Sequence, residues 1–188
     1  MLKNILEFRK HLILTGFRNV KIVDLHEFLD KIKKKTPSNV TVQFFDADFV
    51  AGWEHLYFAV SNALLSIKQK RTISKSLGME ILLYASAQHQ IKRATEIIGI
   101  KPKSQRIAMI VISDKATIAE QALSAISEQV KAQRDESVLE LQAHKVAMIR
   151  KTFGITDNEL SAIETRRNAH EALTDLVIER MALLSTKH

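Results

Sequence analysis

The amino-acid sequence predicts an α+β fold, in which helices cover a small mixed or antiparallel sheet of about four strands. Three observations lead to this prediction. Strand-like segments alternate with helical stretches of unequal length, without a regular βαβ rhythm. The 188 residues are 46% hydrophobic, which is enough to bury one core. Only two prolines and five glycines interrupt the chain. We therefore expect a single domain over residues 1–188, with a C-terminal helix over about 157–184.

Four segments have the composition and periodicity of strands. His11–Arg18 alternates apolar and polar side chains, with Gly16 as a candidate bulge. Val40–Phe45 is short and rich in β-branched and aromatic residues. Arg106–Ser113 is apolar almost throughout, which indicates a central strand. Ser137–Leu141 is expected to be a short edge strand.

The first half of the chain carries four predicted helices. Asp24 is suited to cap a helix over Leu25–Lys35, whose three terminal lysines complement the helix dipole. Ala51–Ile67 is apolar nearly all round and belongs in the centre of the domain. Either Ser74 or Ser76 caps the next helix. A helix over Gln88–Ile98 is expected to end at Gly99 in a left-handed conformation.

The second half carries three more predicted helices. Asp114 is expected to begin a helix that runs to about Gln133. A second helix, over Ala143–Phe153, should end at Gly154. The segment Thr156–Glu159 matches the capping box, in which the first and fourth residues satisfy each other's backbone N–H, and it should begin the final helix.

Positive charge is concentrated in residues 66–106. This window contains nine lysines or arginines and two glutamates, a net charge of +7 that equals that of the whole chain. Such a concentration favours docking of a polyanion, whereas the ordinary alternative is a solvated face. The candidate RNA-binding residues surround a loop between two apolar helices and continue on the following helix: Lys68, Lys70, Arg71, Lys75, Lys92 and Arg93.

Several other functions are disfavoured by the sequence. There is no cysteine, no apolar run of 18 residues, and no glycine-rich phosphate loop. A weaker hypothesis places catalysis or a metal at the clustered Asp46, Asp48, Glu54 and His55, although carboxylates between a strand and a helix usually act as caps. We therefore expect no enzymatic activity, no cofactor, no metal, no small-molecule substrate, no membrane association, and a cytoplasmic protein.

Four segments together resemble a known family. Arg71–Ile100, Gln43–Leu65, Phe153–Leu160 and Leu173–Leu184 are similar to the small KEOPS subunit, the PRPK-binding protein, in its archaeal form. The resemblance implies a non-catalytic adaptor that binds the kinase-like ATPase of that complex. It also implies tRNA binding, notably at the 3′ CCA end, for threonylcarbamoyl-adenosine modification. The alternative is a purely structural or regulatory kinase-binding protein without nucleic-acid contact.

The same resemblance implies a kinase interface, for which the C-terminal helix is a candidate. An apolar stripe with one charged residue at its edge has the composition of a partner surface: Leu173, Leu176, Val177, Arg180 and Met181. Packing of this stripe on the domain itself is the ordinary alternative. The segment Ser161–Ala172 is longer than the family pattern, so we expect the helix to be extended or bent there.

Overall fold

The computed structural model describes residues 1–164 and 168–186, which divide into two compact units. The sheet unit consists of Met1–Ala47 and Ile100–Val138, and the helical unit consists of Asp48–Gly99 and the described residues from Leu139 onward. Helices and an antiparallel sheet together confirm the predicted α+β class. The single domain over the full chain stays a prediction.

The sheet has five strands in the part of the chain that the structure describes, one more than the approximate prediction. All pairs are antiparallel; the order is β1-β2-β4-β3, and β5 also pairs with β2. The predicted central strand does lie between two neighbours, with Leu14 opposite Ile110 and Phe44 opposite Met109. The strands are β1 (Leu2–Ile5), β2 (Lys10–Arg18), β3 (Thr41–Asp46), β4 (Arg106–Ser113) and β5 (Gln133–Arg134).

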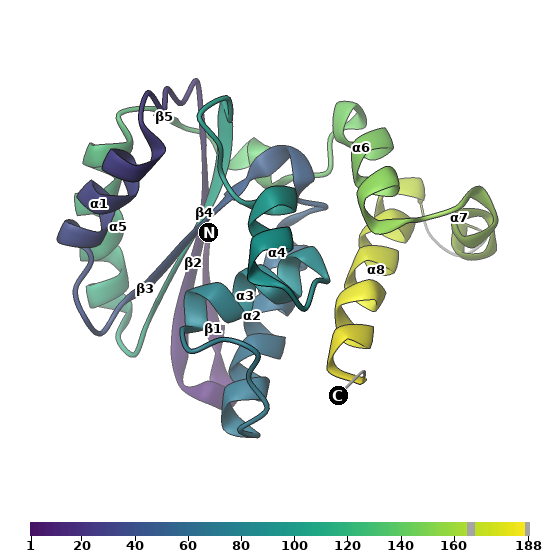
Figure 1. Ribbon diagram of the computed structural model, residues 1–188, viewed down its shortest axis with the longest axis horizontal. Helices are drawn as coiled ribbons and strands as arrows, with labels where there is room; N and C mark the ends of the chain where they lie inside the picture. Colours follow the sequence, from purple (N-terminus) through teal and green to yellow (C-terminus); the bar gives the residue numbers. More distant parts are fainter. Residues whose placement is uncertain (165–167, 187–188) are drawn as a thin grey trace. The chain divides into compact units, whose positions relative to one another are not determined.

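Two helices complete the sheet unit, α1 (Leu25–Lys35) and α5 (Ala116–Val130). Figure 1 shows them on the same face of the sheet, where α5 packs against β2 and β4 and α1 packs against α5. Because side chains alternate along a strand, every second residue of β2 and β4 points to these helices. The core between them includes Ile13, Phe17, Ile107, Met109, Val111 and Ile126.

The helical unit contains six described α-helices. The central helix α3 is almost completely buried, and it packs against α2, α4 and α8. A second apolar core joins α6, α7 and α8, with Ile149, Phe153, Leu173 and Val177 among its members. The helices are α2 (Trp53–Lys68), α3 (Leu77–Ser86), α4 (Ile91–Ile98), α6 (Ala143–Phe153), α7 (Asp157–Glu164) and α8 (Ala169–Ala182).

The backbone conformations predicted for Gly16 and Gly99 were both wrong. Gly16 forms no bulge, because the pairing of β2 with β4 is continuous through it. A Cβ at Gly16 would instead lie 1.9 Å from Val138 Cγ2, so the site requires the absence of a side chain. Gly99 is extended, with φ of −67°, and a Cβ there would lie 2.5 Å from the Thr95 carbonyl oxygen. In both cases close packing selects glycine, in place of the predicted bulge at Gly16 and the predicted left-handed conformation at Gly99.

Some element boundaries also differ from the prediction. Residues 136–139 form a 3-10 helix instead of an edge strand, and β5 occupies Gln133–Arg134. Helix α5 begins after Lys115 and not at Asp114. The expected C-terminal helix is two helices, because Asn168 has an extended backbone and caps α8. The segment Ser161–Ala172 therefore contains a helix end and a new start, and its residues 165–167 lie outside the described residues.

Candidate functional site

The basic loop, residues 68–76, connects α2 to α3 and carries four of the predicted RNA-binding side chains. Lys68, Lys70, Arg71 and Lys75 are all exposed. The loop begins with a helix-ending motif in which the N–H of Arg71 donates to the Ser66 carbonyl and the N–H of Lys70 donates to the Ile67 carbonyl. Lys70 occupies the left-handed position of this motif, with φ of 56°. Glycine is the usual residue there, and a lysine costs about 1 kcal/mol.

A buried carboxylate fixes the conformation of the basic loop through hydrogen bonds. Glu80 of α3 is fully buried and accepts hydrogen bonds from the backbone N–H groups of Ile73 (3.1 Å) and Ser74 (2.7 Å). The hydroxyl of Ser66 lies 3.1 Å from the same carboxylate. Burial, together with the nearby Glu80 charge, raises the pKa of Tyr84 above its ordinary value. Sequence reasoning counted Glu80 as an acid that offsets the basic window, but its carboxylate faces inward.

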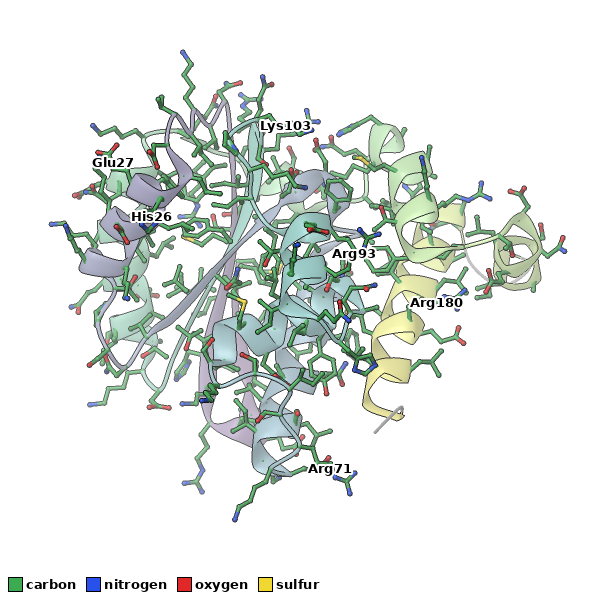
Figure 2. The ribbon with its side chains drawn as sticks, viewed as in Figure 1. His26, Glu27, Arg71, Arg93, Lys103 and Arg180 are labelled. Atoms are coloured by element: carbon green, nitrogen blue, oxygen red, sulfur yellow. The ribbon has the colours of Figure 1, made fainter. Side chains whose placement is uncertain are left out.

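The remaining two predicted RNA-binding residues form a separate group, the α4 pair of Lys92 and Arg93. Both are exposed in the first turn of α4, and Arg93 contacts Glu96 at 3.5 Å. Helix α3, which is about 15 Å long, separates the basic loop from the start of α4 along the chain. Figure 2 shows Arg71 and Arg93 well apart. The six residues therefore provide two cationic groups on the helical unit and not one continuous patch.

Exposed apolar side chains lie beside both cationic groups. Ile67 precedes Lys68 and is 43% exposed, and Ile91 precedes Lys92 and is 44% exposed. Among the aromatic residues, Phe44, Phe45 and Tyr84 are buried and so offer no surface on which a base could stack. Cations beside apolar surface suit an unpaired strand, whose phosphates and bases both need contacts.

The segment that precedes α4 lines a small pocket with a volume of about 180 Å³. Gln88 and His89 line one part of it, and Phe153, Arg180 and Leu184 line another. Its size and its mixture of polar and apolar groups are compatible with a single planar group such as a base.

The predicted kinase-interface residues are mostly in the interior. Leu173, Leu176, Val177 and Met181 are at most 3% exposed. Because their side chains fill the core of the helical unit, they offer no surface to a partner, and packing on the protein itself is the arrangement observed. An interface on α8 would have to use its other face, which includes Thr174, Asp175 and Ile178.

Arg180 connects α8 to α7. Its guanidinium donates to Glu159 and to the carbonyl oxygen of Phe153. The carboxylate of Glu159 also completes the predicted capping box, accepting from the Thr156 N–H at 2.8 Å while the Glu159 N–H donates to the Thr156 hydroxyl. The Thr156 N–H and the Arg180 guanidinium lower the pKa of Glu159 to about 2. Arg180 therefore has a structural role in addition to lining the small pocket.

The acidic cluster of the weaker hypothesis does not form a reactive centre. Asp46 accepts from the Ser104 hydroxyl at 2.6 Å, and Asp48 lies 3.8 Å from His144. His55 is fully buried between the Ala51 N–H and the Ala85 carbonyl, and burial lowers its pKa to about 4. Among residues 1–164 and 168–186, no three His, Asp or Glu side chains are placed to hold a metal ion. Over that same span, every helix is too short or too polar to cross a bilayer.

The fold and these surfaces define a class of binding protein built from an antiparallel sheet unit and a helical unit. The family model "Kinase binding protein CGI-121" matches residues 17–185, so the chain belongs to the CGI-121 family. It is also similar to "Regulatory protein Cgi121" of Methanocaldococcus jannaschii, with 32% identity over 145 residues that cover 77% of this chain and 83% of the relative. These descriptions confirm the resemblance at the level of the family, and the expectation of a non-enzymatic binding protein.

Proposed function

We propose that the protein is the non-catalytic small subunit of a KEOPS-type complex in the cytoplasm. In this role it binds the kinase-like ATPase and recruits tRNA, through the 3′ CCA end, for threonylcarbamoyl-adenosine modification. Membership of a kinase-binding family supports the first contact. The basic loop carries the proposal for RNA, because residues 66–79 contain no acid and Glu80 faces inward. Two weak contacts within one assembly raise the effective affinity for tRNA without new chemistry.

The first experiment tests the basic loop by charge reversal. We expect Lys70→Glu combined with Arg71→Glu to weaken binding of the natural tRNA about 100-fold, since each charge-assisted contact contributes roughly 1.5 kcal/mol. The slope of log affinity against log salt should fall by about 0.7 for each lost single-strand phosphate contact. Filter binding at two salt concentrations measures both quantities.

A matched control makes this result specific to the loop. Lys33→Glu with Lys34→Glu makes the same change of charge on the exposed last turn of α1. We expect this control to retain most of the tRNA affinity. If both double variants lose affinity equally, general charge and not the basic loop attracts the RNA.

Removal of the CCA end distinguishes the proposal from a kinase-binding protein without nucleic-acid contact. We expect tRNA that lacks CCA to bind more weakly, and Lys92→Glu with Arg93→Glu to reduce that difference. Equal and salt-insensitive binding of the two tRNAs, or none at all, would favour the structural or regulatory alternative.

A further inference from the structure

The helical unit contains a groove with a volume of about 720 Å³ that none of the predicted RNA-binding or kinase-interface residues lines. One wall comes from the first turns of α2, with Trp53, Glu54 and Phe58. The opposite wall is the face of α8 that points away from the core, with Thr174 and Ile178. Residues 139–141 close a third side. Voids inside a packed core are rarely larger than a water molecule, whereas a space of this size is typical of a binding site.

The apolar part of the groove contains exposed aromatic surface. Phe58 is 42% exposed, although α2 is otherwise one of the most apolar helices of the protein. The ring of Tyr57 contacts the rings of Trp53 and Phe58 edge to face, at centroid distances of 6.2 and 5.7 Å. Aromatic side chains held in this way are the residues that most often anchor a protein partner.

The charge of the groove is opposite to that of the chain. Glu54, Glu140, Glu171 and Asp175 line it, and none of the described lining residues is a lysine or arginine. The whole chain has a net charge of +7, whereas the four acids make the charge of the groove negative. RNA is disfavoured as an occupant because its phosphates would meet these carboxylates. A segment that carries arginine or lysine would be attracted.

Buried groups fix the walls in place. Thr174 of α8 donates to the Ala51 carbonyl at 2.6 Å, and the Ala51 N–H donates to Nδ1 of the buried His55 at 3.1 Å. Gly52 follows with φ of 127°, and a Cβ there would lie 3.0 Å from the Glu54 carboxylate. On the third side, the fully buried Lys145 donates to the Glu140 carbonyl at 2.9 Å. A groove with fixed walls loses little entropy when a partner binds.

We propose that this acidic groove docks the kinase-like partner through a polypeptide segment in which arginine or lysine accompanies apolar side chains. The inference rests on the kinase-binding part of the proposed function, and it adds the surface and the chemistry of the contact. It also replaces the buried stripe of α8 with the opposite face of the same helix. The apolar side chains would cover Phe58 and Ile178, while the cations would meet Glu171 and Asp175.

The test uses the full chain and the purified kinase-like subunit in isothermal titration. We expect Glu171→Lys combined with Asp175→Lys to weaken binding of the kinase-like subunit at least about tenfold, and Phe58→Ala to weaken it similarly. The matched control is Glu120→Lys with Glu128→Lys, two exposed acids of α5. This control should bind like the wild type, and all three variants should remain folded and keep the wild-type tRNA affinity.

Three results would overturn the inference. If the wild type and the groove variants bind the kinase-like subunit equally, the groove is not the docking surface, while the proposed kinase-binding function stands. If the wild type does not bind the kinase-like subunit, the proposed function and the inference both fail. If the groove variants change tRNA affinity and leave kinase binding unaltered, the groove belongs to the RNA surface.

Discussion

At the scale of single residues, Glu80 has the largest consequence for the RNA surface. Its carboxylate is buried and accepts from two consecutive backbone N–H groups of the basic loop. Hydrogen bonds to a charged group contribute about 1.5–3 kcal/mol each. We therefore expect Glu80→Ala to lower the free energy of unfolding by about 3 kcal/mol and to weaken tRNA binding, because the loop no longer has a fixed conformation. Urea unfolding and filter binding measure the two effects.

The comparison for this prediction is Glu96→Ala. Glu96 is an exposed acid of α4 in the same basic window, so its removal should change stability by less than about 0.5 kcal/mol. Removing Glu96 should also leave tRNA affinity unchanged or slightly raised. Equal stabilities of the Glu80 and Glu96 variants would contradict the role assigned to Glu80.

His55 predicts a pH dependence of stability. Burial lowers its pKa from 6.5 to about 4, so between these values the unfolded chain binds a proton that the folded protein does not. The contribution of His55 is complete above about pH 6.5 and is lost as the pH falls toward 4, a change of about 3 kcal/mol. Urea unfolding of the wild type and of His55→Asn should diverge over this range. The control His26→Asn, at a highly exposed histidine, should follow the wild type.

At the scale of elements, Leu176 tests whether the apolar stripe of α8 is core or interface. Leu176 is 3% exposed within the second apolar core. We expect Leu176→Ala to lower the free energy of unfolding by about 3 kcal/mol through the cavity that it leaves. Leu183→Ala, at a side chain that is 42% exposed, should cost less than about 1 kcal/mol. A fully stable Leu176 variant that fails to bind the kinase-like subunit would restore the stripe as an interface.

Local sequence signals correctly predicted features that lie within a single helix or strand. Asp24 caps α1 through the Glu27 N–H, Ser76 caps α3 through the Met79 N–H, and the capping box of Thr156 forms as expected. The strand Arg106–Ser113 is confirmed at both ends. Each capping contact joins residues three positions apart, and the strand is one continuous apolar run, so the sequence displays both signals directly.

Several of the errors concern contacts between distant segments. The fit of Gly16 depends on Val138, more than a hundred residues away. Glu80 is buried against the end of the preceding helix, where Ser66 contacts its carboxylate, and the stripe of α8 packs in a core with residues of α6 and α7. Both a core stripe and an interface stripe are apolar at helical spacing, so periodicity cannot distinguish them. The acidic groove was missed for the same reason, because its acids come from three separate segments.

At the scale of the molecule, charge is separated along α2. Glu54 lies in its first turn within the acidic groove, and Lys68 ends it at the basic loop, about 20 Å further along the helix axis. This arrangement matches the helix dipole, which favours anions at the first turn and cations at the last. One helix thus presents opposite charges at its two ends, which suits one partner that is an anion and another that carries cations.

This separation predicts that the two binding functions can be removed independently. We expect Lys70→Glu with Arg71→Glu to lose tRNA affinity and retain kinase binding, and Glu171→Lys with Asp175→Lys to do the reverse. In the quadruple variant each loss should equal that of its own double variant within about 0.5 kcal/mol, because the sites are too distant to couple directly. Filter binding and isothermal titration on all four proteins measure this. A loss of kinase binding in the basic-loop variant would mean that one partner covers both ends of α2, and the assignment of separate surfaces would then be wrong.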